Sequence, residues 1–190
     1  MVAQDHWRNH FGVEASGNFT VGKDNVGEFS RFRGVTVGGN YKWFLVKGLF
    51  LRPELTVYYE NHDESILDFS GEMEEHYNQA RDGSGNHSTE VGIGLATMIG
   101  YRIPVSKLIS YDFFTGPYYS VALDQHETLY GRHYINEYNR SSLRWRVGVG
   151  VNVWRIKVGA SFDWSLLKLD RKYSDDRENN VVNISLGYNF

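Results

Sequence analysis

The stretch LRWRVGVGVNV, Leu143 to Val153, alternates strictly between two kinds of residue. Its odd-numbered positions are apolar, whereas its even-numbered positions are arginine, glycine and asparagine. Because successive side chains of a β-strand lie on opposite faces, this period of two predicts a strand with one apolar and one polar face. The stretch VVNISLGYNF, residues 181–190, repeats the alternation and ends on an aromatic residue.

The same alternation recurs throughout the chain. Besides the two stretches above, it is present in residues 11–21, 35–42, 51–60, 90–102, 111–121 and 156–166. Together these stretches predict about eight strands of roughly ten residues each, the length that crosses a bilayer as a tilted β-strand. We therefore expect an all-β fold, an eight-stranded antiparallel transmembrane barrel of the outer-membrane type, with residues 1–190 forming a single domain.

The segments between these strands alternate in length. Three are short, at residues 43–48, 104–109 and 154–155, and four are longer and polar, at residues 23–31, 61–87, 124–140 and 168–180. Short turns at one end and long loops at the other are typical of outer-membrane barrels, and an even strand number places both termini at the short-turn end.

The composition excludes several classes of function. The chain has 190 residues and a net charge of -3, so nothing favours nucleic-acid binding, which usually requires a basic face. It contains no cysteine, which excludes disulfides and thiolate metal sites. We expect no cofactor and no metal, because the histidines and acidic residues of the 61–87 segment follow no ligand spacing.

The apolar face carries aromatic residues at two heights, which indicates that it faces lipid. One girdle is expected near the short turns, formed by Phe11, Tyr41, Tyr101, Tyr111, Tyr188 and Phe190. The other lies eight to ten residues further along the strands, formed by Phe19, Tyr59, Tyr119, Trp145 and Trp164. Aromatic girdles around an aliphatic band are the interface anchors of bilayer proteins. The alternative is a soluble lipocalin-like ligand-binding barrel in which these aromatic residues form the core.

The polar face then lines a narrow lumen. It carries charges of both signs, and we expect a closing ion-pair network among Glu14, Arg52, Glu54, Glu90, Arg144, Arg146 and Asp163. Eight strands enclose just enough space for side chains, and unpaired buried charges are costly. The pattern therefore predicts a plugged interior rather than a channel.

Four phrases resemble the PorT-like outer-membrane β-barrel family of Bacteroidetes. They are GVEASGNFT at residues 12–20, RPELTVY at 52–58, GPY at 116–118 and LGYNF at 186–190. Their order and spacing are similar to the family's over nearly the whole chain, although Glu90-Val-Gly-Ile stands where the family often has Glu-x-Pro. The resemblance implies an eight-stranded outer-membrane barrel in the cell envelope, and one named member of the family serves a secretion system.

Two classes of function remain open. The first is a non-enzymatic barrel of the outer membrane, with periplasmic termini and extracellular loops that bind a partner or serve the envelope. Its expected partners are the bilayer, lipopolysaccharide and an envelope or secretion protein, contacted through segments 61–87 and 124–140. The second is an outer-leaflet acyltransferase or deacylase using His87, Ser88 and Glu90, or His126, Glu127 and Ser120. We expect no catalytic residue, since nothing in the sequence fixes such a geometry.

Overall fold

The computed structural model describes residues 7–21, 31–64, 86–129, 132–135, 141–168 and 180–190. These form the strands β1 (His10–Val21), β2 (Arg31–Phe44), β3 (Leu49–Glu64), β4 (Asn86–Pro104), β5 (Ile109–Leu129), β6 (Arg132–Ile135), β7 (Ser141–Val153), β8 (Ile156–Lys168) and β9 (Asn180–Asn189). Within these ranges, no helix is long and apolar enough to cross a membrane.

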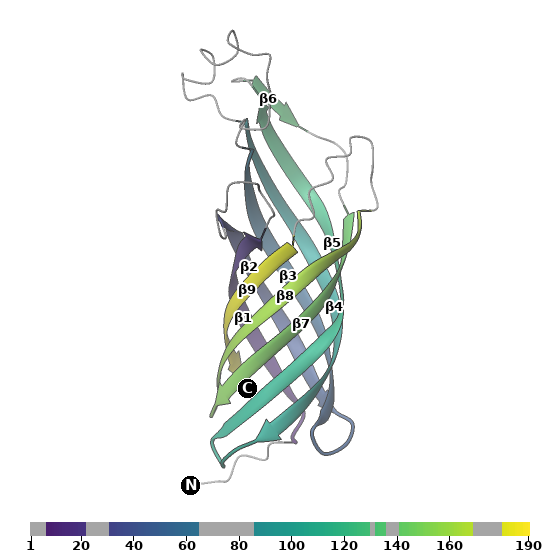
Figure 1. Cartoon of the computed structure of the whole chain (residues 1–190), viewed down its shortest axis with the longest axis vertical. Coiled ribbons are helices and arrows are strands. Elements are labelled where there is room, and N and C mark those ends of the chain that lie inside the picture. Colours follow the sequence, from purple (N-terminus) through teal and green to yellow (C-terminus); the bar gives the residue numbers. More distant parts are fainter. Residues whose placement is uncertain (1–6, 22–30, 65–85, 130–131, 136–140, 169–179) are drawn as a thin grey trace.

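Eight of the strands close into the predicted antiparallel barrel (Figure 1). They follow the order β4-β3-β2-β1-β9-β8-β7-β5, and pairing of β4 with β5 completes the ring, while β6 pairs only with β5. The turns β2–β3, β4–β5 and β7–β8 lie at one end, where β1 also begins and β9 ends (Figure 1). We call this the short-turn end.

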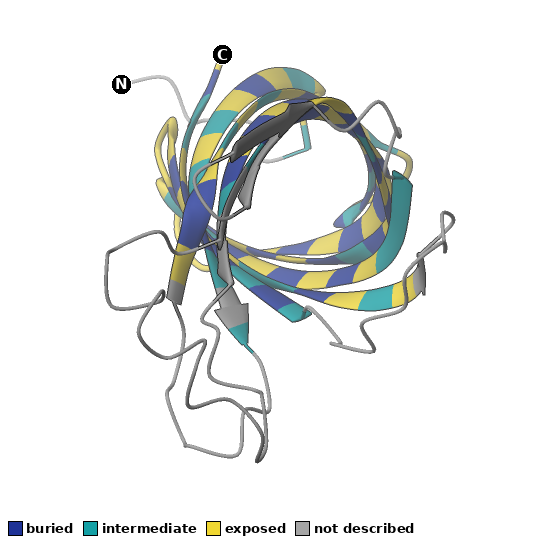
Figure 2. Cartoon of the chain, turned by 90° about the horizontal axis from the view of Figure 1, so that it is seen from above, coloured by how far each residue is buried: buried dark blue, intermediate teal, exposed yellow. Residues whose placement is uncertain are grey.

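The apolar face of each strand points away from the barrel axis. On β7, Trp145, Val147 and Val149 are 39–48% exposed, whereas Arg146, Gly148 and Gly150 are buried. Figure 2 shows the same alternation of buried and exposed residues around the ring. A soluble barrel would bury the apolar side chains, so this arrangement contradicts the lipocalin-like alternative.

The strand register fixes the tilt of the barrel. The tilt can be measured by moving from each residue to its direct register partner on the next strand. Starting at Phe11, this row of partners leads through the pairs Pro53–Thr97 and Pro117–Trp145 to Trp164. The row then reaches β9, where Asn180 pairs with Val21 of β1, so it returns at residue 21 instead of residue 11, a shift of ten. With strands about 4.8 Å apart and a rise of about 3.3 Å per residue, this shift corresponds to a tilt of about 40°.

One side of the barrel continues beyond the ring. β3, β4 and β5 have 16, 19 and 21 residues, compared with 10 in β9. Residues 61–64 pair with residues 86–89, and His126–Leu129 pair with β6. The expected loops 61–87 and 124–140 are therefore partly strands, a correction to the sequence interpretation. In residues 61–64 and 86–89 the positions of both faces are polar. The sequence therefore shows no alternation there that would predict a strand. The remainder, residues 65–85, 130–131 and 136–140, lies outside the described residues.

The lumen contains an aromatic cluster as well as charges. Phe50, Met98, Phe114 and Tyr118 are all at most 5% exposed and pack together inside the ring. Their rings lie directly against glycines of neighbouring strands: Phe50 against Gly100, Phe114 against Gly148 and Tyr118 against Gly94. A methyl group at any of these glycines would collide with a ring, so glycine on the inner face makes room for the bulky residues.

Candidate functional site: the closed lumen

A chain of six charged side chains crosses the middle of the lumen, and we call it the middle chain. It runs in the order Lys157, Glu14, Arg52, Glu54, Arg146, Asp163. The Nζ atom of Lys157 lies 2.5 Å from Glu14 Oε2, and Arg52 donates to Glu54 at 2.6 Å. Cations and anions alternate along it, so its three positive and three negative groups cancel.

Arg146 is the best-paired member of the middle chain. Its guanidinium donates two bonds to Asp163, at 2.7 and 2.8 Å, and a third to Glu54 at 3.1 Å. Arg146 and Asp163 are direct register partners on β7 and β8, whereas Glu54 reaches Arg146 from β3, on the other side of the ring. Two-point pairing of this kind is the strongest form of side-chain ion pair.

Aromatic rings cover the cations of the middle chain. The guanidinium carbon of Arg52 lies 4.3 Å from the ring centre of Phe114, and that of Arg146 lies 4.2 Å from the ring centre of Tyr118. Such contacts offset part of the cost of burying a cation. The cavity beside the middle chain has a volume of only about 20 Å³, room for about one water molecule.

A second group of charges, the lower cluster, lies toward the short-turn end and consists of Lys42, Arg102 and Asp112. Asp112 accepts two bonds from Arg102, at 2.6 and 2.9 Å, and a third from the Nζ atom of Lys42 at 2.5 Å. The Lys42 and Asp112 side chains are each 1% exposed. One carboxylate is therefore shared by two buried basic side chains.

Aromatic residues lie beside the lower cluster, toward the short-turn end. The ring of Phe44 lies 5.7 Å from that of Phe50, and Trp7 packs edge-on against Phe44 at 5.8 Å. Asn9 accepts a bond from the Phe44 backbone, which links the segment before β1 to the end of β2.

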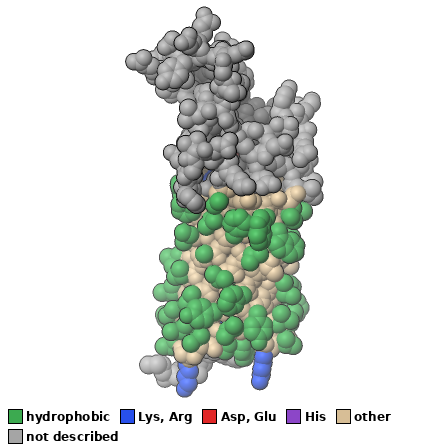
Figure 3. Space-filling model, in the orientation of Figure 1, with side chains coloured by type: hydrophobic (Ala, Val, Ile, Leu, Met, Phe, Trp, Pro, Cys, Tyr) green, Lys and Arg blue, Asp and Glu red, His purple; other side chains and the backbone are tan. Residues whose placement is uncertain are grey.

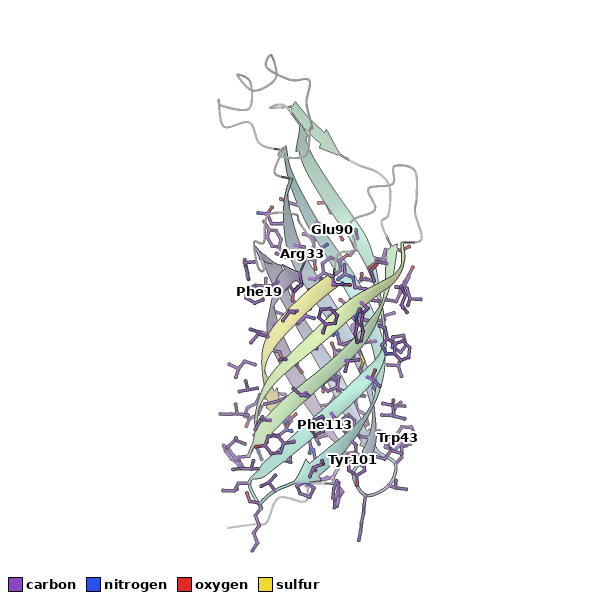
Figure 4. All side chains as sticks on the ribbon, viewed as in Figure 1. Phe19, Arg33, Trp43, Glu90, Tyr101 and Phe113 are labelled. Atoms are coloured by element: carbon purple, nitrogen blue, oxygen red, sulfur yellow. The ribbon has the colours of Figure 1, made fainter. Side chains whose placement is uncertain are left out.

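An upper group lies near the opposite end, where Figure 4 labels Arg33 and Glu90. The Nε atom of Arg33 lies 2.7 Å from Glu60, and Tyr58 donates to Glu90 at 2.6 Å. Arg144 is half-buried in this region, on the inner face of β7. The interior thus contains ion pairs at three heights.

The structure brings five of the seven predicted network residues together: Glu14, Arg52, Glu54, Arg146 and Asp163 all belong to the middle chain. Glu90 instead bonds Tyr58 at a greater height, and Arg144 has no ion-pair partner within 4.0 Å among the described residues. Lys157 was not included in the predicted network, nor was the lower cluster. Their positions on the polar face were visible in the sequence, but their height was not.

The aromatic residues expected in the girdles lie on the outward faces of the strands. Phe11 packs against Tyr41 with ring centres 4.7 Å apart, and Trp145 and Trp164 are direct register partners on β7 and β8. Figure 4 labels Tyr101 toward the short-turn end and Phe19 toward the other. The remaining residues of the two sets are exposed or partly exposed: Tyr59, Tyr111, Tyr119, Tyr188 and Phe190. Trp43 and Phe113 also lie low on the outer face (Figure 4) and were missed. Figure 3 shows many apolar side chains on the visible outer face of the barrel.

The residues considered for catalysis lie on β4 and β5. His87 and Ser88 are consecutive on β4, and consecutive positions belong to opposite faces of a strand. The same holds for His126 and Glu127 on β5. In the described part of the chain, no three His, Asp or Glu residues are grouped as metal ligands.

Comparisons with known proteins agree with this geometry. Residues 2–171 match the family model described as outer membrane protein beta-barrel domain. No curated protein matches the sequence. Among solved structures, the chain is similar to a major outer membrane protein of Thermus thermophilus, with a TM-score of 0.55 and 15% identity over 96% of this chain and 100% of the other. It is also similar to Ail, the attachment invasion locus protein of Yersinia pestis, with a TM-score of 0.53 and 12% identity over 96% and 97%. For Neisserial surface protein A the TM-score is 0.52, with 11% identity over 95% of each chain. At these identities the likeness concerns the fold alone.

Proposed function

This chain belongs to the outer membrane protein beta-barrel domain family, and from that premise we propose that it is a non-enzymatic surface barrel. In this proposal residues 1–190 form one barrel domain that spans the outer membrane. Its termini and short turns face the periplasm, its long connections face the exterior, and it acts by binding a partner rather than by transport.

The closed lumen is the observation that carries this proposal. Transport would require a continuous aqueous path, whereas the middle chain, the lower cluster and the aromatic cluster all lie inside the ring. The cavity beside the middle chain, about 20 Å³, is far too small for a solute. A closed eight-stranded barrel offers recognition mainly through the segments at its ends.

The contact surface is proposed at the end opposite the short turns. There β3, β4, β5 and β6 continue beyond the ring as a paired sheet. We propose segments 61–87 and 124–140 as the contact region, with lipopolysaccharide as its membrane neighbour and an envelope or secretion protein as its partner. The PorT-like phrases at residues 12–20, 52–58, 116–118 and 186–190 support a place in that Bacteroidetes family.

The lipid-modifying alternative is less well supported by the strand positions. Ser120 and His126 lie six residues apart on β5, about 20 Å along an extended strand, whereas a serine nucleophile of the triad type must bond its histidine directly. The Ser120 hydroxyl instead shares a hydrogen bond with that of Ser142, at 2.7 Å.

The two functions are separated by deleting the gene and analysing outer-membrane lipids by mass spectrometry. We expect acylation of the lipids to remain unchanged, and the purified protein to give no steady large conductance in planar bilayers. A loss of acylation or deacylation that wild type restores, but His87→Ala or His126→Ala does not, would establish the enzyme instead. A sustained current from the wild-type protein would contradict the closed lumen.

A further inference from the structure

The three turns at the short-turn end share an unusual composition. Each contains one basic residue, Lys47, Lys107 or Arg155, and all three are exposed. Each also exposes apolar side chains, including Val46 at 64%, Val105 at 61% and Trp154 at 54%. Turns in water normally carry polar residues, so exposed apolar groups in all three indicate a surrounding that is only partly aqueous.

The charge at this end has one sign among the described residues. Residues 7–9, 45–48, 105–108 and 154–155 contain the exposed cations Arg8, Lys47, Lys107 and Arg155 and no aspartate or glutamate. Asp112, the carboxylate nearest in height, is 1% exposed and is bonded to Lys42 and Arg102 inside the lumen. In Figure 3, basic side chains extend beyond the lower edge of the apolar band.

Trp154 adds an independent observation. It occupies a two-residue turn between β7 and β8 with a φ of 55°, in the left-handed region that hairpins usually fill with glycine or asparagine. A bulky residue in this conformation carries strain, and such strain is a sign of a function. The guanidinium carbon of Arg155 lies 5.4 Å from the Trp154 ring centre, and Arg155 Nη1 donates to the Tyr188 hydroxyl at 3.2 Å. The turn therefore holds a cation directly beside an interfacial aromatic residue.

We propose that the three turns of the short-turn end form a binding ring for anionic phospholipid headgroups of the adjoining leaflet. Lys47, Lys107 and Arg155 bind the phosphates, while Val46, Val105 and Trp154 enter the boundary between headgroups and acyl chains. Basic side chains with apolar stems and tryptophan side chains are both suited to this boundary. The inference rests on the proposed membrane location and adds a ligand class that the location alone does not give.

The spacing of the cations favours lipid over a protein partner. The turns join β2 to β3, β4 to β5 and β7 to β8, so they are distributed around the ring rather than gathered on one side. A single docked protein requires one continuous patch, whereas separate headgroups can each occupy one turn.

The test measures lipids retained by the folded barrel. Wild-type protein is inserted into vesicles of equal phosphatidylglycerol and phosphatidylcholine, extracted gently, and its bound lipids are counted by native mass spectrometry. We expect wild type to retain phosphatidylglycerol about fivefold over phosphatidylcholine at low salt, with the excess falling at high salt. In K47Q/K107Q/R155Q this ratio should fall to about one.

The matched control is R171Q/K172Q/R177Q, which removes the same charge from the connection between β8 and β9 and should retain the wild-type ratio. Each variant is first shown to fold by its shifted band on an unboiled gel. If the triple variant does not fold, the single variants K47Q, K107Q and R155Q replace it, each with an expected drop of about twofold.

Equal retention of the two lipids by wild type, or an unchanged ratio in the variant, would overturn the inference and leave the membrane barrel standing. A parallel sample tests lipopolysaccharide, and a loss of its retention in place of phosphatidylglycerol would also overturn the inference. Failure of the wild type to insert into vesicles would instead refute the proposed function together with the inference.

Discussion

The middle chain and the lower cluster bury similar groups in the same lumen but distribute their charges differently. In the middle chain three carboxylates serve three cations, and both Arg52 and Arg146 contact two carboxylates. In the lower cluster one carboxylate, Asp112, serves both Lys42 and Arg102. The difference teaches that Arg52 and Arg146 of the middle chain each keep a second carboxylate when Glu54 is lost, whereas in the lower cluster Lys42 and Arg102 bond the same carboxylate.

The largest effect is therefore expected for Asp112→Asn. The change takes a carboxylate from two buried cations at once, and we expect the free energy of unfolding to fall by about 3–5 kcal/mol. Urea titration of the folded barrel in micelles, followed by tryptophan fluorescence, measures this loss.

Asp163→Asn is the matched control for this first substitution. Asp163 is also 1% exposed and also receives two bonds from an arginine, but that arginine keeps Glu54 at 3.1 Å. We expect a smaller loss, about 2 kcal/mol. Equal losses in the two variants would show that the number of remaining partners does not matter, and the comparison would fail.

A smaller effect is expected for Glu54→Gln in the middle chain. The carboxylate is lost, yet Arg52 keeps Glu14 at 3.8 Å and Arg146 keeps both bonds to Asp163. The amide oxygen of glutamine can still accept one hydrogen bond, so the expected loss is about 1–2 kcal/mol. The same titration measures it, and a loss larger than that of Asp112→Asn would reverse the proposed order of the two regions.

The sequence predicted which residues share the lumen, because a period of two assigns every position to a face. Pairs on adjacent strands could also be predicted from the sequence, such as Arg146 with Asp163, which are direct register partners. The pairs that cross the lumen could not be derived in this way. Lys42 on β2 meets Asp112 on β5, and these strands are separated by two others in the ring.

Cross-lumen contacts depend on the tilt of the barrel, and the tilt follows from the register shift of ten residues around the ring. The alternation pattern contains no information about that shift, because it is the same at every height. For this reason Lys157 and the lower cluster were assigned to the correct face, but their partners were not identified. The paired extension of β3, β4 and β5 was missed for a related reason, since polar residues on both faces leave no alternation to detect.

The smallest effect, and the sharpest test of the comparison, is expected for Lys42→Met. The substitution removes the Lys42 ammonium and leaves Asp112 bonded to Arg102. The methionine has a similar length and would lie beside the ring of Phe50, whose centre is 4.9 Å from the Lys42 Nζ atom in the wild type. Asp112 keeps both bonds from Arg102, so the substitution leaves no buried charge uncompensated, and we expect a change below about 1 kcal/mol in either direction. Lys42→Met should also reduce the damage of Asp112→Asn, because only one cation then loses its carboxylate. A double-mutant cycle measures this coupling, and strictly additive losses would mean that Lys42 and Asp112 do not stabilise one another.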